Sequence, residues 1–282
     1  IDGDGRVDLV SGTEVWMQNA SGGFDLAWHL GTAVNDTAVA DLDGDGKAEI
    51  IHLRSVFTAN ADQIGIFIYS YDGQLKRRIP LQGAWITPLT IADVDGDGRS
   101  DIVVGADGTL YAFRDDGRPI WAYKVPPDLP DNPILAPYYP VPTQSSQVGN
   151  AAPQVYDLDG DGVAEVVFSA YSRIIILNGR TGLRKVNPYW TYGYNYNDVS
   201  ALMLIDMTND GHVDIVQNST FLFNCGFSGA DFATQCANLV GPIVLSGGGS
   251  NNWRPGPKVA GRCIRASPTR LPRWGPRRPA AS

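Results

Sequence analysis

Residues 41–49 read DLDGDGKAE, a stretch in which four of nine residues are carboxylates. The same internal spacing recurs as DVDGDGRSD at 93–101, DLDGDGVAE at 157–165 and DMTNDGHVD at 206–214. The chain opens with IDGDGRVD at 1–8, which is the same unit without its first residue. One acidic loop is therefore used five times, once truncated and once imperfect.

The distance between copies indicates the size of the repeating unit. The loops that begin at residues 41, 93, 157 and 206 are 52, 64 and 49 residues apart. A repeat of this length is typical of a four-stranded sheet with its turns, and it is too long for most helical-pair or leucine-rich repeats.

The residues beside each loop predict strands. The loop at 41–49 follows TAVA (37–40) and leads into AEIIHL (48–53), and the other copies have similar short, apolar, β-branched flanks. Such runs, bounded by Gly and Asp, are typical of buried strands. Each unit then continues with two β-rich runs joined by a Gly-containing turn, as in IFIYSYDGQLKRRIPL at 66–81. The predicted unit is a strand, the acidic loop, and three further strands.

Repeated four-stranded units bury their faces against one another, and a radial array of such sheets is a β-propeller. A two-sheet sandwich is the alternative, but it would not be expected to repeat one loop at one place in every unit. The predicted fold class is all-β, a β-propeller with about four to five blades present. We expect the chain to be part of a larger propeller, for example a seven-bladed one.

The spacing within the loop is suited to a hard cation. Acidic side chains at positions one, three, five and nine, with a Gly at six for a sharp reversal, can direct their oxygens at one ion. Calcium accepts six to eight oxygens in irregular geometry, whereas magnesium requires a near-ideal octahedron, so the pattern favours calcium. An EF-hand is excluded because its position twelve needs Glu, and here that position is His52, Val104, Phe168 or Gln217.

The D-x-D-x-D-G-x-x-D pattern resembles the loops of the FG-GAP family, which forms the blades of the integrin α-subunit propeller and of many bacterial secreted proteins. The resemblance covers roughly residues 1–220 and implies calcium bound between the first two strands of a blade. It implies side-chain ligands at Asp41, Asp43, Asp45 and Glu49, at Asp93, Asp95, Asp97 and Asp101, and at Asp157, Asp159, Asp161 and Glu165. Position seven, occupied by Lys47, Arg99 and Val163, is expected to contribute a backbone carbonyl.

Two further copies predict weaker sites, so we expect about three strong calcium sites and one or two weak ones. The truncated copy offers Asp2, Asp4 and Asp8, and the last copy, in which Thr208 replaces the third Asp, offers Asp206, Asp210 and Asp214. A turn that binds nothing is the alternative for any single loop, because Asp and Gly are ordinary turn residues. Three complete copies favour a cation, since clustered carboxylates repel one another without one.

The charge distribution limits the partners. The chain has a net charge of −8, but residues 254–282 hold eight Lys and Arg and no acid, which leaves 14 basic and 30 acidic residues in 1–253, a net charge of −16. Such an acidic surface argues against nucleic acid. No apolar run is long enough to span a membrane. Because weak calcium sites fill at millimolar calcium, we expect a secreted, cell-surface or periplasmic protein.

The sequence divides into a propeller region, 1–253, and a basic tail, 254–282, which is rich in Pro and Arg and is expected to be disordered. The tail is interpreted either as a basic arm for polyanions or as the product of a reading-frame slip after Val259, and we favour the slip. Cys225 and Cys236 can form a disulfide or remain two buried thiols, and Cys263 is left over.

Two connections between blades stand out. Residues 126–153 contain eight prolines and account for the 64-residue step. Residues 187–197 carry five aromatic side chains, namely Tyr189, Trp190, Tyr192, Tyr194 and Tyr196. Exposed aromatic rings are typical of glycan or protein recognition, whereas the alternative is packing against the neighbouring blade.

No nucleophile elbow, P-loop or zinc-spacing motif occurs, so an enzyme is not favoured. The first hypothesis is a non-catalytic calcium-binding module of a longer polypeptide, used for adhesion or for recognition of an extracellular protein or glycan. The second is a fragment of a calcium-dependent polysaccharide lyase of the rhamnogalacturonan-lyase type, some of which resemble this chain. A lyase needs a base and charge-neutralising groups at the central cleft, whereas a recognition module would carry an aromatic rim.

Overall fold

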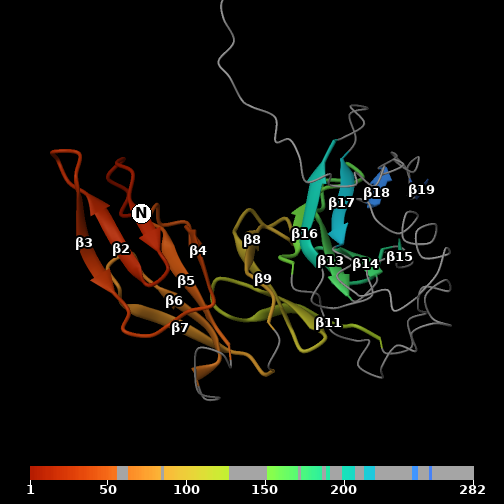
Figure 1. Cartoon of the computed structure of the whole chain (residues 1–282), viewed down its shortest axis with the longest axis horizontal. Coiled ribbons are helices and arrows are strands. Elements are labelled where there is room, and N and C mark those ends of the chain that lie inside the picture. Colours follow the sequence, from red (N-terminus) through yellow and green to blue (C-terminus); the bar gives the residue numbers. More distant parts are fainter. Residues whose placement is uncertain are drawn as a thin grey trace, which may run out of the picture.

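A computed structural model describes most of the first four repeats and part of the fifth. The described residues are 1–55, 63–83, 86–126, 151–170, 173–185, 189–190, 199–206, 213–219, 243–246 and 254–255. They form nineteen strands in five antiparallel sheets, and no α-helix occurs among them (Figure 1). Within these ranges, no helix is long and apolar enough to cross a membrane.

Each sheet contains consecutive strands in chain order, which is the meander of a propeller blade. Blade 1 comprises β1 (Leu9–Ser11), β2 (Glu14–Gln18) and β3 (Phe24–His29). Blade 2 comprises β4 (Asp36–Ala40), β5 (Glu49–Arg54), β6 (Gly65–Tyr69) and β7 (Leu75–Pro80). Blade 3 comprises β8 (Thr90–Ala92), β9 (Asp101–Ala106), β10 (Thr109–Phe113) and β11 (Pro119–Lys124).

The last two sheets follow the same order. Blade 4 comprises β12 (Gln154–Tyr156), β13 (Glu165–Ala170), β14 (Arg173–Asn178) and β15 (Tyr189–Trp190). Blade 5 comprises β16 (Val199–Ile205), β17 (Asp214–Ser219), β18 (Ile243–Ser246) and β19 (Arg254–Pro255). The β-propeller expected from the repeats, with about four to five blades, is therefore confirmed.

Burial along the strands explains their order within a blade. The second strands β5, β9 and β13 are buried at every position, because both of their faces are covered by neighbouring blades. The outer strand β7 is exposed at every position except Ile79. Continuous apolar runs therefore form the second strands, and alternating or polar runs form the outer strands.

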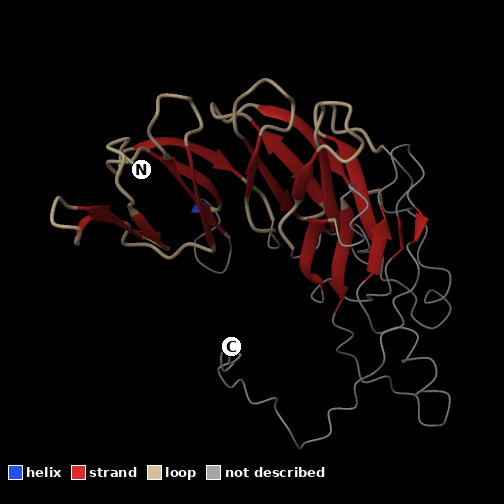
Figure 2. Ribbon diagram, turned by 90° about the horizontal axis from the view of Figure 1, so that it is seen from above, coloured by secondary structure: helices blue, strands red, loops and turns tan. Residues whose placement is uncertain are grey.

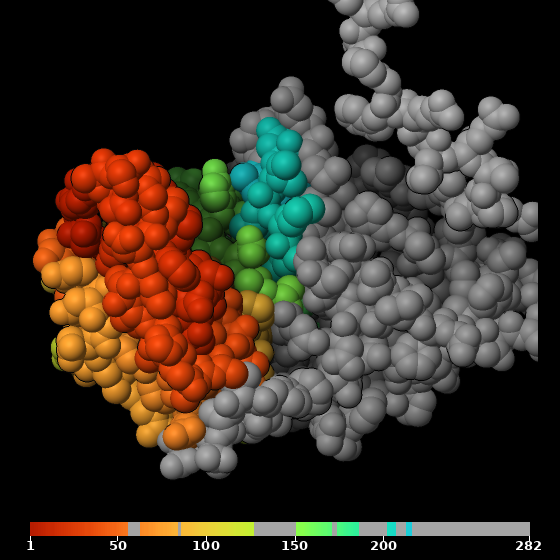
Figure 3. Space-filling view, turned by 60° about the vertical axis from the view of Figure 1, so that its left-hand side comes forward, coloured from red at the N-terminus to blue at the C-terminus, as the bar shows by residue number. Residues whose placement is uncertain are grey.

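The first strands of the blades are innermost, since β4, β8, β12 and β16 contact one another in succession. Figure 2 shows the sheets following one another along an arc. Blade 1 corresponds to the second, third and fourth strands of the other blades, because its acidic loop precedes β1. Its surface adjoins that of blade 2 (Figure 3), and the Thr37 hydroxyl donates to the Gly12 carbonyl across this interface at 3.2 Å.

The hydrophobic core lies between blades. One cluster joins blades 2 and 3 and includes Ile51, Leu53 and Ile102. A second joins blades 3 and 4 through Val103 and Phe168, and a third joins blades 4 and 5. Blades 2 to 5 therefore depend on their neighbours for the burial of their apolar side chains, as expected of a repeat fold.

One contact between adjacent blades is repeated three times. A large side chain of the outer strand packs on a glycine with positive φ in the last hairpin of the next blade, and the three pairs are Trp28 with Gly73, Ile79 with Gly117 and Trp121 with Gly182. The two tryptophans also donate from Nε1 to backbone carbonyls of that hairpin, at 2.8 Å and 2.6 Å. The absence of a Cβ at these glycines lets the large side chain approach the turn.

Some expectations are corrected or fall outside the described ranges. Tyr189 and Trp190 form β15, the outer strand of blade 4, where the sequence suggested a connection between blades. Arg254–Pro255 form β19 in the sheet of blade 5, and the division of the chain into a propeller region and a basic tail stays a prediction. The cysteines Cys225, Cys236 and Cys263, the proline-rich segment from 127 to 150 and the tail from 256 onwards lie outside the described residues.

Candidate metal centres

The three complete acidic loops occupy the same place in blades 2, 3 and 4. Each connects the innermost strand to the buried second strand, as 41–49 connects β4 to β5. The hairpin between the third and fourth strands lies on the same face, because Lys76 at the start of β7 contacts Asp43 in the loop. The two kinds of loop therefore share a face.

The first aspartate of each loop holds the turn together. Asp41 accepts from the Gly44 and Asp45 amides through Oδ1, at 2.7 Å and 3.1 Å, and from the Gly46 amide through Oδ2, at 2.9 Å. Asp93 and Asp157 accept the equivalent three bonds in their own loops. The first position therefore has a structural role in the loop that requires no cation.

The last acidic residue of each loop is buried at the start of the second strand. Glu49, Asp101 and Glu165 are at most 3% exposed. Each accepts from the amide of the second loop residue, at distances of 2.8 Å to 3.0 Å. This bond uses one carboxylate oxygen. In blades 2 and 4 the other oxygen accepts a hydrogen bond from a lysine, Lys76 for Glu49 and Lys185 for Glu165.

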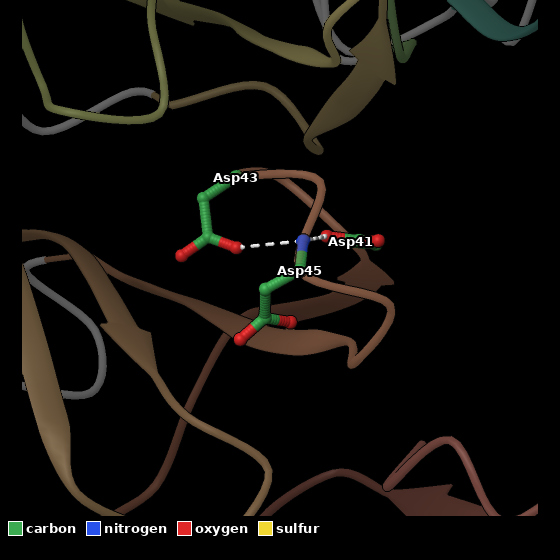
Figure 4. A group of neighbouring side chains, drawn as sticks. All are labelled: Asp41, Asp43 and Asp45. Atoms are coloured by element: carbon green, nitrogen blue, oxygen red, sulfur yellow. Dashed lines mark hydrogen bonds between the residues drawn. The ribbon is translucent and has the colours of Figure 1, made fainter.

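Three groups of carboxylates converge. Asp41, Asp43 and Asp45 form the group of blade 2, and Figure 4 shows the Asp45 amide between the other two carboxylates. The other groups are Asp93, Asp95 and Asp101 in blade 3, and Asp157, Asp159 and Glu165 in blade 4. In each group, one oxygen per residue lies within 4.8 Å of the others.

A positively charged side chain from elsewhere in the blade reaches each group. The Lys76 ammonium lies 2.6 Å from Asp43 Oδ2 and 2.8 Å from Glu49 Oε1. The Lys185 ammonium lies 2.7 Å from Asp159 Oδ2, 2.7 Å from Glu165 Oε1 and 3.3 Å from Asp161 Oδ2. In blade 3, the Arg114 guanidinium contacts Asp95 and Asp97.

The pKa values reflect this balance between burial and charge. Burial, together with the negative charges of Asp95 and Asp97, raises the pKa of Asp101 to about 6. Burial also raises the pKa of Glu165, although hydrogen bonds from Lys185 and the Leu158 amide oppose the change. The hydrogen bond from Lys76 lowers the pKa of Asp43. A buried carboxylate in these loops therefore carries an electrostatic cost that a nearby cation relieves.

Burial alone would lower the pKa of Lys76 and of Lys185, but their hydrogen bonds to the loop carboxylates raise both pKa values above the usual range for lysine. The two ammonium groups are consequently charged at neutral pH. None of these three basic residues was predicted from the sequence. A usable signal exists for the lysines, since both stand three residues after the glycine of the hairpin, at Gly73 and Gly182.

Several predicted ligands lie apart from the convergent groups. Among the described residues, Asp97 and Asp161 are not members of a group, and Glu49 contacts Lys76 instead. The amides of Lys47, Arg99 and Val163 donate to the carboxylate two residues earlier, at 2.8 Å to 3.0 Å. The use of their carbonyls as ligands stays a prediction.

The truncated and imperfect copies differ from the three complete loops. Asp2, Asp4 and Asp8 do not form a convergent group in the described structure. The Asp8 carboxylate instead accepts from the N-terminal ammonium at 2.7 Å and from the Gln18 amide at 2.9 Å. In the fifth copy, Asp206 and Asp214 are described but Asp210 lies outside the described residues.

The aromatic candidates are only partly described. Tyr189 and Trp190 pair with Ile174 and Arg173 in the sheet of blade 4. Tyr192, Tyr194 and Tyr196 lie outside the described residues. Recognition by these rings stays a prediction.

The convergent groups fit a hard divalent cation. All of their donors are carboxylate oxygens, the ligands that calcium prefers. The position of the Lys185 ammonium among three carboxylates indicates that a positive charge is accommodated there. We therefore consider the loops of blades 2, 3 and 4 to be chemically suited to calcium.

Comparison with known proteins supports the propeller. Residues 62–136 match the family model of the lambda-carrageenase β-propeller domain. Rhamnogalacturonan exolyase YesX of Bacillus subtilis (strain 168) is 33% identical over an alignment of 90 residues, which covers 27% of this chain and 15% of the enzyme. This chain therefore matches only a small part of that enzyme's length.

Solved structures similar to this chain include a polysaccharide lyase and a sugar-binding lectin. The crystal structure of YesX has a TM-score of 0.45 and 17% identity, with 75% of this chain and 42% of that chain covered. A lectin of Agrocybe aegerita that recognises non-reducing terminal N-acetylglucosamine has a TM-score of 0.48 and 19% identity, with 90% and 63% covered. The chain thus contains a β-propeller domain that is similar in sequence to part of a rhamnogalacturonan lyase.

Proposed function

We propose that this chain is a calcium-stabilised β-propeller module. The observation that carries the proposal is the convergence of three carboxylates at the same place in three successive blades. A single acidic turn is common without an ion, but carboxylates converge in the same loop of three blades, and the groups of blades 3 and 4 include buried members, which are costly unless a cation neutralises them.

Calcium would supply positive charge where the innermost and second strands meet. The loop side chains would hold it: position one through the carboxylate that already anchors the turn, position three through Asp43, Asp95 or Asp159, and position nine through the buried acid. Calcium is favoured over magnesium because it accepts six to eight protein oxygens in irregular geometry, whereas magnesium retains several waters and a strict octahedron. Each bound ion would tie the loop to the start of the second strand.

The biological role that we propose is recognition of a glycan or protein outside the cell, as a module of a longer polypeptide. Weak calcium sites fill in extracellular or periplasmic compartments. The sequence similarity to carbohydrate-acting propellers points to polysaccharides as the ligand class. The aromatic residues from Tyr189 to Tyr196 are the proposed contact surface.

A lyase fragment is the second candidate, and the similarity to YesX favours it. The described innermost strands, however, expose apolar side chains, with Val39 at 42%, Tyr156 at 50%, Met203 at 50% and Ile205 at 51%. Among the described residues, these four strands contain no His, Lys or Arg that could serve as a base or neutralise a uronate. Exposed apolar area of this kind is typical of recognition surfaces.

Thermal unfolding of the full chain in millimolar calcium, in millimolar magnesium and in excess chelator tests the proposal. Three sites with dissociation constants near 0.1 to 1 mM would add roughly 1 to 4 kcal/mol of stability at about 1 mM calcium. We expect a calcium-specific rise in Tm of several degrees. An identical Tm in calcium and in chelator would contradict the proposal.

A matched variant isolates the loops. Asp43→Asn, Asp95→Asn and Asp159→Asn, made together, remove one charge from each convergent group and keep the shape of the side chain. We expect this variant to lose most of the calcium-dependent rise. If it kept the full rise, calcium would be acting elsewhere on the chain.

The two candidate roles are separated by incubation with rhamnogalacturonan and with λ-carrageenan. A recognition module would bind one of these polymers in a calcium-dependent pull-down and release no unsaturated product. Formation of the ultraviolet-absorbing unsaturated product would instead support the lyase.

A further inference from the structure

Lysine side chains occupy equivalent places in two blades that are not adjacent. Lys76 and Lys185 each stand three residues after the glycine of the last hairpin, and each reaches across the blade to the acidic loop. Both contact the carboxylates at positions three and nine, and Lys185 also contacts position five. The contacted residues include members of the convergent groups, namely Asp43, Asp159 and Glu165.

In blade 3 an arginine at another position contacts the acidic loop. The position equivalent to the lysines is Ile120, which carries no charge. Arg114, three residues before the hairpin glycine Gly117, contacts positions three and five instead. A cation is therefore delivered to all three groups, although the residue that delivers it changes.

An ammonium group and a divalent cation would compete for these oxygens. Lys185 Nζ lies at hydrogen-bond distance from three carboxylates, so a metal bound to the same oxygens would lie close to it. Two positive charges at such a separation repel each other. The side chains are 37% exposed for Lys76 and 18% exposed for Lys185, which leaves each a path toward solvent.

We propose that Lys76 and Lys185 are built-in counter-ions that neutralise the loops of blades 2 and 4 without metal and that a divalent cation must displace. This inference rests on the calcium binding proposed above. The lysines set the affinity of their loops, because part of the binding free energy of the metal is used to break the existing ion pairs. They also hold the outer edge of the blade to the loop when calcium is absent.

The double variant Lys76→Met and Lys185→Met tests this inference, because methionine keeps the apolar stem and removes the charge. Two measurements are needed: calcium affinity by isothermal titration calorimetry, and Tm in chelator. We expect calcium to bind at least about tenfold more tightly to the altered loops, since a single charged hydrogen-bonded contact that no longer has to be broken is worth about that factor. We also expect a lower Tm in chelator, so the calcium-dependent rise in Tm becomes larger.

Lys124→Met is the control for net charge. Lys124 lies exposed at the end of β11, and no contact between it and an acidic loop is present in the described structure. This variant should leave both the affinity and the Tm in chelator unchanged. If it tightened calcium binding as much as the double variant, a general charge effect would replace the inference.

The outcomes separate the inference from the proposed function. Calcium binding by the wild type with equal affinity in the double variant would overturn the inference and leave the calcium-stabilised module intact. Binding by the double variant alone would support the inference, with the lysines as permanent occupants. Binding by neither protein would overturn both.

If the methionine variant folds only in calcium, that result supports the inference. If it folds in neither condition, Lys76→Gln and Lys185→Gln take its place, since glutamine keeps a donor without the charge.

Discussion

Asp157 and Glu165 illustrate how differently two acids of one loop are used. Asp157 accepts three amide bonds within the turn and is partly exposed, whereas Glu165 is 1% exposed and accepts from the Leu158 amide. The first residue shapes the loop and the last one connects it to the second strand. Position in the loop, and not acidity alone, therefore determines which carboxylates need a cation.

His52 is a titratable residue in a fully buried position. It is fully buried on the face of β5 opposite Ile51 and Leu53, and its ring meets that of Tyr69 edge-on with centroids 5.6 Å apart. In the described structure neither ring nitrogen has a hydrogen-bond partner. Burial, with a contribution from the charge of Arg54, lowers the pKa of His52 to about 4.

We expect this histidine to make the protein less stable in mild acid. Because the pKa of His52 is lower in the folded state than in the unfolded state, the unfolded state binds more protons between about pH 6.5 and pH 4, and stability is lost as the pH falls through this window. The loss attributable to His52 is about 3 kcal/mol at pH 4. Urea unfolding in chelator at several pH values measures it.

His52→Phe is the matched variant, because Phe168 occupies the equivalent, fully buried position of β13. Protonation of the carboxylates affects both proteins alike, so the difference between their pH profiles isolates the histidine. The variant should lose less stability than the wild type between pH 7 and pH 4. Parallel profiles would show that His52 is not buried in its neutral form.

Contacts between elements repeat as regularly as the loops do. Trp121 on β11 packs over Gly182 of blade 4, and its Nε1 donates to the Gly179 carbonyl at 2.6 Å. Trp28 on β3 makes the corresponding contact with Gly73 of blade 2. The outer strand of one blade is thereby joined to the hairpin of the next.

Substitution of the hairpin glycine should weaken this junction. Gly182 has φ +66°, and a Cβ there would lie 2.6 Å from Trp121 Cγ, so Gly182→Ala combines backbone strain with a clash. Gly12 has φ +56°, and a Cβ added there would meet no atom within 4 Å, so Gly12→Ala carries the strain alone. We expect a loss of about 1 to 2 kcal/mol for Gly12→Ala and about 1 to 3 kcal/mol more for Gly182→Ala. Chemical denaturation compares them, and equal losses would contradict the proposed packing.

At the scale of the whole molecule, the blades share their cores. Phe168 of blade 4 is fully buried in the cluster that also contains Val103 and Leu110 of blade 3. Because the apolar faces of one blade are covered by the next, the described clusters of blades 2 to 5 are all shared with a neighbouring blade. Unfolding of one blade should expose the core of the adjacent blade.

Phe168→Ala should therefore destabilise blades 3 and 4 together. We expect a loss of about 3 to 5 kcal/mol, and amide hydrogen exchange should accelerate by a similar factor in β9 and in β13. Hydrogen exchange resolved by peptide measures both strands in one experiment. Faster exchange in β13 alone would show that the blades are energetically independent.

Local sequence determined the strands and the loops of this protein. Apolar β-branched runs, Gly-containing turns and five acidic repeats each act over fewer than about ten residues, and a strand or tight turn is formed by contacts at that range. The blade count followed from repetition, because identical units pack in the same way. Repetition also allowed the positions of the first and last acidic residues of each complete loop to be predicted, because they recur at the same spacing in every copy.

Only the tertiary structure decided which basic side chains contact the acidic loops. Lys76 is 33 residues from Asp43, and Arg114 is 19 residues from Asp95, so their approach depends on how the hairpin between the third and fourth strands folds back over the blade. The burial of His52 depends on which face of β5 is covered by blade 1. These features arise from packing between strands and between blades, and no short stretch of sequence contains both partners. The acidic loops were determined by the sequence itself, whereas their counter-ions were determined by the fold.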